Sequence, residues 1–171
     1  SGLKGSEPGI GEILDAASEA NLPINVMCSG NLSIFKALAE THPNTQLVID
    51  HLGLQQPFAP PPPENPFADI QQVMALSKFD NVAIKISGAC TLSHKAFPYP
   101  DIWEPLGRIF SAFGFDRCMW GTDWTRAVEL LTYKQGVESF RLTDSISDDE
   151  RHRLMGGTLT KIYSWHPSVS K

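Results

Sequence analysis

Short apolar runs of strand length alternate along this chain with longer amphipathic stretches. The runs are rich in aliphatic and β-branched residues, which favours strands, and they lie at 24–28, 47–51, 82–86 and 118–121. The stretches around them carry apolar residues at helical spacing and lie at 10–20, 32–40, 67–77, 101–113, 129–140 and 147–164. Because nearly continuous apolar strands are typical of parallel sheets covered by helices, the sequence predicts an α/β fold of repeated β-α units.

Two architectures are compatible with this pattern. One is a compact, doubly wound sheet of about four to five strands. The other is the C-terminal half of a larger barrel, since a closed eight-stranded barrel takes about 250 residues and this chain has 171. A half-barrel leaves two sheet edges open to pairing with another chain. The pattern alone does not choose between the two.

Composition excludes several classes of partner and cofactor. The 14 Lys and Arg residues against 19 Asp and Glu give a net charge of −5, without the clustered basic surface that nucleic acids or anionic membranes require. No apolar run approaches the roughly 20 residues of a membrane span, and because residues 1–6 contain no apolar stretch we expect no secretory signal. The three cysteines are widely spaced and Gly53, Gly88 and Gly121 stand singly. We therefore expect a cytoplasmic protein without disulfides or a nucleotide cofactor.

The chain is expected to form a single domain over 1–171, with one compositionally biased segment. Residues 57–66 form a proline-rich loop. The favoured interpretation is a stiff polyproline spacer after the second strand. The alternatives are a rigid lid over a site at the strand ends and a docking ligand for an SH3 or WW module.

Polar residues end the second strand, where α/β proteins of this type bind ligands. Asp50 and His51 follow an aliphatic run, and burying either is costly unless it is paired. Strict alternation places His51 on the face of Leu47 and Ile49, with Asp50 pointing the opposite way, so the two do not form a simple dyad. A catalytic histidine is favoured over a structural one.

Lys85 lies in the middle of the third apolar strand. A lysine in such a strand must find a carboxylate or point into a polar cavity. It could orient an anionic substrate, stabilise an oxyanion or form a Schiff base. The alternative is an ion pair that takes no part in chemistry.

Asp123 ends the fourth strand in the segment Gly-Thr-Asp-Trp and is the strongest single candidate. An aspartate there suits a general base for water or a hard metal ligand, and the alternative is an Asx turn or a helix N-cap. Trp124 would help to exclude water. Arg126 could bind a carboxylate or be a plain surface charge.

Three segments in order resemble the amidohydrolase-related family, and more narrowly its lactonase branch, whose members act on pyrone dicarboxylate, sulfomuconolactone and sugar lactones. The segments are Val-Ile-Asp-His-Leu-Gly at 48–53, Val-Ala-Ile-Lys-Ile-Ser-Gly at 82–88, and Phe-Gly-Phe-Asp-Arg-Cys-Met-Trp-Gly-Thr-Asp-Trp at 113–124. The resemblance implies that the strands are the fifth to eighth of a (β/α)8 barrel. Asp123 then matches the catalytic aspartate of the eighth strand, and His51 the histidine closing the sixth.

The chain departs from the family pattern at several points. The family's His-x-His pair on the first barrel strand has no counterpart here, and the first strand of this chain ends in Cys28 instead of a histidine. A zinc site with Asp123 as a ligand would therefore lack two ligands, although some of the lactonase branch is similar in needing no metal. Thr125 stands where many relatives have proline.

The resemblance implies a hydrolase that opens a lactone or similar cyclic ester. Asp123 would take a proton from water, His51 would polarise the carbonyl, and Lys85 would add positive charge for an anionic lactone. Trp124 and Arg126 would contact the substrate. The alternatives are a metal-dependent decarboxylase, a Schiff-base aldolase and a non-catalytic assembly module. A homodimer or a missing N-terminal half would cover the sheet edges.

Overall fold

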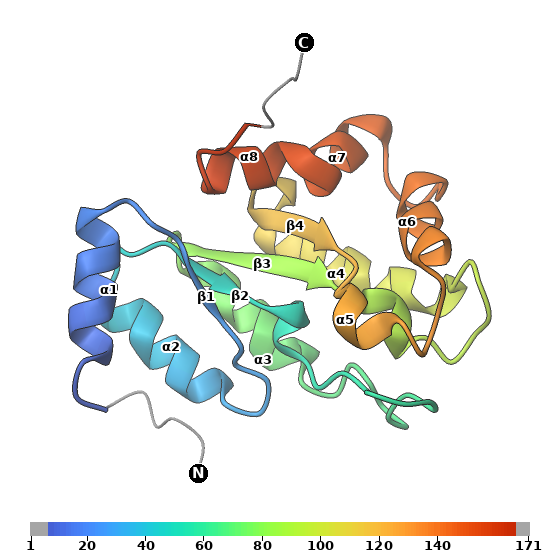
Figure 1. The fold of residues 1–171 in the computed structure, drawn as a ribbon, viewed down its shortest axis with the longest axis horizontal. Coiled ribbons are helices and arrows are strands. Elements are labelled where there is room, and N and C mark those ends of the chain that lie inside the picture. Colours follow the sequence, from blue (N-terminus) through green and yellow to red (C-terminus); the bar gives the residue numbers. More distant parts are fainter. Residues whose placement is uncertain (1–6, 167–171) are drawn as a thin grey trace.

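Four parallel strands form one sheet in a computed structural model that describes residues 7–166. The strands are β1 (Ile24–Val26), β2 (Leu47–Ile49), β3 (Val82–Ser87) and β4 (Cys118–Gly121). Each pairs with its predecessor in the chain, so the spatial order is β1-β2-β3-β4 (Figure 1). The expected α/β class is confirmed.

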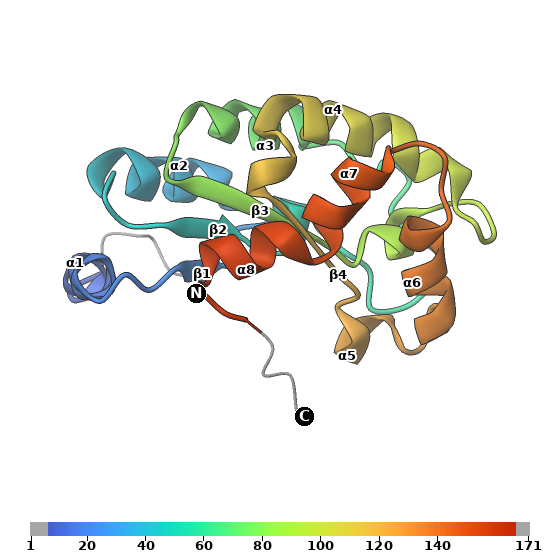
Figure 2. The ribbon, with the colours of Figure 1, turned by 90° about the horizontal axis from the view of Figure 1, so that it is seen from above.

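The helices that connect the strands cover one face of the sheet. They are α2 (Leu32–Thr41), α3 (Ile70–Ala75) and α4 (Trp103–Phe113), and they lie on the same side of the sheet in Figure 2. The main core fills this interface, where Leu47, Ile49 and Ile84 are fully buried. A doubly wound sheet reverses its strand order and carries helices on both faces. The unbroken order here is that of a barrel segment.

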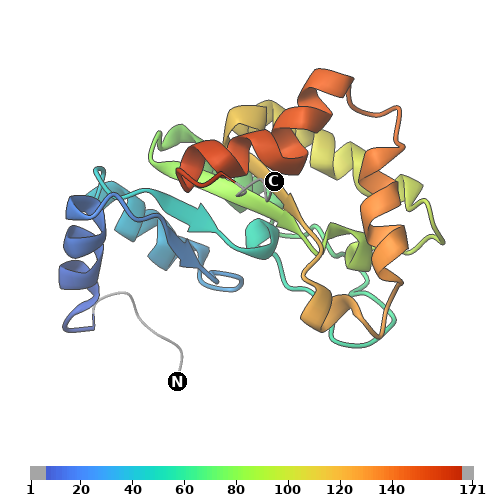
Figure 3. The same cartoon turned by 45° about the horizontal axis from the view of Figure 1, so that its top comes forward.

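The opposite face of the sheet is covered by α8 (Thr158–Ile162) and carries a smaller group of buried residues. Val48, Ala83 and Met119 are buried there against Leu159, Ile162 and Tyr163. The Tyr163 hydroxyl donates a hydrogen bond to Asn25 Oδ1 at 2.5 Å, which links the residue after α8 to β1. Figure 3 shows α8 lying against the sheet.

The remaining helices are α1 (Ile10–Glu19), α5 (Trp124–Ala127), α6 (Tyr133–Arg141) and α7 (Asp148–His152). The helix expected at 129–140 begins only at Tyr133, after a capping box between Thr132 and Gln135, and α5 is an additional turn of helix. The helix expected at 147–164 is interrupted by a π-helical turn, Arg153–Gly157. Within 7–166, no helix is long and apolar enough to cross a membrane.

The proline-rich segment 57–66 contains no helix or strand and packs against the body of the protein. Arg126 donates to the carbonyl oxygen of Pro57 at 2.6 Å, and His94 Nε2 lies 3.0 Å from the carbonyl oxygen of Pro63. Prolines of the segment also border a cavity of about 280 Å³ with residues of the loop after β3. The segment is therefore held at two separate points.

Candidate active site

The segments that follow β2, β3 and β4 meet at the carboxyl end of the sheet (Figure 1). A cavity of about 330 Å³ opens there. It lies where parallel α/β proteins bind their ligands. The lining residues are Met27, Ser29, Asp50, His51, Leu54, Gln56, Phe58, Asp123, Thr125 and Arg126.

His51 is held in a left-handed turn directly after β2. Its φ is 50°, and Leu52 and Gly53 continue at 64° and 65°, a conformation that non-glycine residues rarely adopt and that is concentrated at functional sites. His51 Nδ1 lies 2.9 Å from Ser87 Oγ and 3.4 Å from Asp123 Oδ2. The turn ends the strict alternation of the strand, so the prediction that Asp50 and His51 diverge was wrong in part: both line the same cavity.

Asp123 also has a positive φ, of 52°, and precedes α5. Its side chain makes no capping hydrogen bond to that helix. Instead, Oδ2 accepts a hydrogen bond from Arg126 Nε at 2.6 Å, in addition to its approach to His51. With 11% of its side chain exposed, the carboxylate lies in the cavity wall and faces two polar partners.

Arg126 is not a surface charge, since only 8% of its side chain is exposed. Besides Asp123, its guanidinium donates to the carbonyl oxygen of Pro57 at 2.6 Å, to Thr91 Oγ1 at 3.1 Å and to Gln56 Oε1. The amide nitrogen of Gln56 donates in turn to two carbonyl oxygens, those of His51 and Ser87, at 3.0 and 2.9 Å. One buried cation therefore joins the segments after β2, β3 and β4.

Two of the expected site residues do not line the cavity. Lys85 Nζ lies 3.0 Å from Asp50 Oδ1 and 5.9 Å from the ring centre of Tyr163, so this ion pair lies on the face of the sheet that α8 covers. Trp124 packs edge-to-face on Tyr133, with 5.4 Å between ring centres. The structure thus brings together His51, Asp123 and Arg126.

Three polar residues of this network were not predicted as site residues: Gln56, Ser87 and Thr91. Alternation along β3 placed Ser87 on the face of Lys85 and was a usable signal. Gln56 and Thr91 lie in irregular segments, where no periodicity reports the direction of a side chain. Their partner Arg126 is 70 and 35 positions away in the sequence.

Residues 7–166 do not by themselves supply a complete set of zinc ligands. Zinc sites in proteins use at least three protein ligands, and residues 7–166 contain no cluster of three or more His, Cys, Asp or Glu side chains that could hold a metal. Asp123 Oδ2 is already bonded to the Arg126 cation. Cys28 does not line the cavity, and burial raises the pKa of its thiol to about 12. The zinc expectation stays a prediction.

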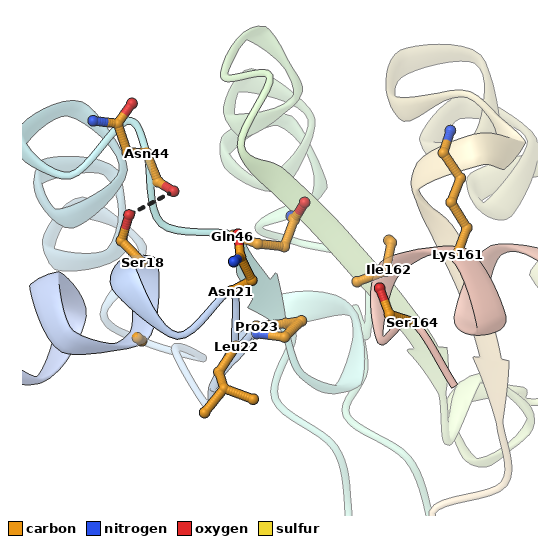
Figure 4. A pocket seen from close by; sticks show the side chains of 10 residues that line it. Ser18, Asn21, Leu22, Pro23, Asn44, Gln46, Lys161, Ile162 and Ser164 are labelled. Carbon is orange, nitrogen blue, oxygen red and sulfur yellow. Dashed lines mark hydrogen bonds between the residues drawn. The ribbon is translucent and has the colours of Figure 1, made fainter. Parts of the chain in front are cut away.

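Another cavity, of about 290 Å³, lies between α1, the segments before β1 and β2, and α8 (Figure 4). Its polar lining consists mainly of amides and hydroxyls, and Ser18 Oγ donates to the carbonyl oxygen of Asn44 at 3.1 Å. Lys161 is the single charged residue among those that line it. Among the residues that line this cavity there is no counterpart of the His51–Asp123 pair, so the cavity at the strand ends is the candidate site.

The sequence matches the model of the amidohydrolase family over residues 2–165. It is 35% identical over 80 residues to the 4-sulfomuconolactone hydrolase of Rhizobium radiobacter, which is 47% of this chain and 25% of that protein. The enzyme of the same name from Hydrogenophaga intermedia is 24% identical over 120 residues, or 68% of this chain and 38% of that protein. A zinc-bound amidohydrolase structure from Burkholderia multivorans superposes with a TM-score of 0.80 at 23% identity, covering 95% of this chain and 59% of that one.

The chain therefore spans between a quarter and three fifths of the length of these relatives. Its four parallel strands match one part of an amidohydrolase barrel, which confirms the expected partial barrel.

Proposed function

Because the chain belongs to the amidohydrolase family, we propose that it supplies catalytic residues to a hydrolase that opens a lactone or a similar cyclic ester. The observation that carries the proposal is the approach of His51 Nδ1 to Asp123 Oδ2, 3.4 Å, at a cavity beyond the strand ends. The names of both curated relatives, 4-sulfomuconolactone hydrolases, support a lactone as substrate.

In this proposal Asp123 is the general base. Arg126 holds one carboxylate oxygen, and the other accepts a proton from a water molecule as that water attacks the carbonyl carbon of the lactone. The carbon–oxygen bond of the ring then breaks. The aspartic acid returns its proton to the leaving oxygen, which yields an open-chain hydroxy acid.

His51 stabilises the negative charge that develops on the carbonyl oxygen. The proposal assigns the proton of His51 to Nε2, and Ser87 Oγ, 2.9 Å from Nδ1, can then donate its hydroxyl hydrogen bond to Nδ1. No residue in the described part of the chain forms a hydrogen bond with Nε2, which leaves it available to the substrate. A donor of this kind contributes about 3–4 kcal/mol to the transition state.

The charges near the cavity shape the substrate expectation. Lys85 neutralises Asp50, a residue of the cavity lining, so an anionic lactone meets no uncompensated carboxylate from that strand. Met27, Leu54 and Phe58 provide apolar surface for the ring. We expect small lactones as substrates, including anionic ones.

The experiment is the Asp123→Asn variant, assayed against a panel of lactones that includes 4-sulfomuconolactone. We expect kcat to fall at least about 10²-fold. The thermal midpoint should also fall, because the buried Arg126 loses its carboxylate partner, but the asparagine oxygen can still accept the hydrogen bond from Nε, so the variant should fold. Asp116→Asn is the matched control, because this carboxylate is 65% exposed and only loosely paired, at 3.8 Å, with Arg153. Turnover by Asp123→Asn at the wild-type rate would remove Asp123 from the mechanism.

A further inference from the structure

We propose that Arg126 is a positioning residue, which fixes the Asp123 carboxylate and the cavity wall at 56–58, and that its guanidinium does not bind the substrate. The kinetic part of this inference rests on the proposed function. Its structural part stands on hydrogen bonds that link three segments far apart in the sequence.

The hydrogen bonds of Arg126 leave little capacity for a ligand. A guanidinium has five N–H donors in a rigid fork, and here they meet four acceptors of the protein: Asp123, Pro57, Thr91 and Gln56. To bind a substrate carboxylate, Arg126 would have to release acceptors of which Thr91 and Asp123 are largely buried, which is costly.

The backbone beside Arg126 is shaped to admit this contact. Gly88, directly after β3, has a φ of +72°, and a Cβ there would overlap with Gln56 Oε1 and Arg126 Nη2. The absence of a side chain at Gly88 is therefore what allows the Gln56 amide and the guanidinium to meet. This requirement is independent of the hydrogen bonds and points to the same arrangement.

Two parts of the site depend on Arg126. One is the direction of the Asp123 carboxylate, which is bonded to Nε at 2.6 Å. The other is the wall that carries Phe58, whose side chain is 80% exposed and therefore has little packing of its own to hold it. The bond to Pro57 is thus an anchor directly beside Phe58.

Limited chymotrypsin digestion tests the structural part on the chain itself. We expect the initial rate of cleavage after Phe58, followed by mass spectrometry, to rise at least about tenfold in Arg126→Met and Arg126→Lys. Arg126→Lys keeps the charge beside Asp123 and loses the fork, which provides a folded variant if Arg126→Met does not fold. Cleavage after the buried Phe35 in α2 should stay at the wild-type rate, which excludes global unfolding.

The matched control is Arg141→Met, which removes an arginine that is 56% exposed and paired with Glu138, and it should leave both rates unchanged. Unchanged cleavage after Phe58 in both Arg126 variants would overturn the anchor.

Lactone kinetics test the second part. For Arg126→Lys we expect kcat to fall about tenfold or more with KM within about twofold, the pattern of a displaced base. A rise in KM at constant kcat would identify Arg126 as a substrate contact and overturn the inference. If the wild type opens no lactone, the proposed function fails, whereas the digestion still decides whether Arg126 anchors the wall.

Discussion

The Gly88→Ala substitution tests how closely the site is packed. Its cost has two parts, of which the first is the left-handed backbone, since φ is +72° and an L-residue there costs about 1–2 kcal/mol. The second is the overlap of the new methyl group with Gln56 and Arg126, an overpacking cost of about 1–3 kcal/mol.

Gly30→Ala separates the two parts. Gly30 has nearly the same φ, +75°, but a Cβ there would meet nothing within 4 Å. It should therefore show the backbone cost alone, and Gly88→Ala should be less stable than Gly30→Ala by about 1–3 kcal/mol.

Thermal unfolding followed by circular dichroism measures the difference. For a domain of this size, each kcal/mol lowers the midpoint by about 2–4 °C, so the Gly88→Ala midpoint should lie about 2–12 °C below that of Gly30→Ala. Equal midpoints would mean that Gln56 and Arg126 do not occupy the space that a Cβ at Gly88 would take, and the reasoning about this network would be refuted.

Three further predictions concern charges and thiols. Lys85→Met leaves the half-buried carboxylate of Asp50 without a cation, so the free energy of unfolding in urea titrations should fall by about 1–3 kcal/mol. Lys78→Met is the control: this lysine is 57% exposed, and its loss should change the free energy of unfolding by no more than about 0.5 kcal/mol. Burial raises the pKa of Cys90 to about 11, so this thiol should react with a disulfide reagent at pH 8 only after unfolding; fast reaction in the native state would contradict its burial. Hydrogen bonds from the amide and hydroxyl of Ser147 lower the pKa of Glu150; the stability that this adds is present above the unfolded pKa of about 4.3 and is lost as pH falls through the folded value. The midpoint difference between wild type and Glu150→Gln should accordingly shrink below about pH 4, and a constant difference would count against this assignment.

The fold was predictable because strands and helices leave periodic patterns. The aliphatic run Leu47–Ile49 predicted β2. The expected start of α6 at residue 129 was wrong by four residues, because the capping box of Thr132 and Gln135 was not used as a signal. The end of β2 was harder to predict. Alternation continued through His51, whereas the chain turns into the left-handed region there.

The site was predictable only in its strand-end residues. Asp123 and His51 were candidates because burying a polar group at a strand end is costly unless the group is paired. The burial of Arg126 and its hydrogen bond to a carbonyl oxygen 69 positions away depend on tertiary packing. Local sequence patterns do not encode such packing. The same holds for Lys85: the sequence left an ion pair open as an alternative but did not identify Asp50 as the partner.

The hydrogen bond between Tyr163 and Asn25 also bears on the order of folding. Each strand of the sheet pairs with its chain neighbour, but this bond closes a loop of 138 positions, and long loops close at a greater entropic cost. Docking of α8 should therefore follow sheet formation, and under mild denaturation this helix should detach before the sheet opens. Val48, Ala83 and Met119 would then face solvent, so self-association should begin from a molecule whose sheet is still intact.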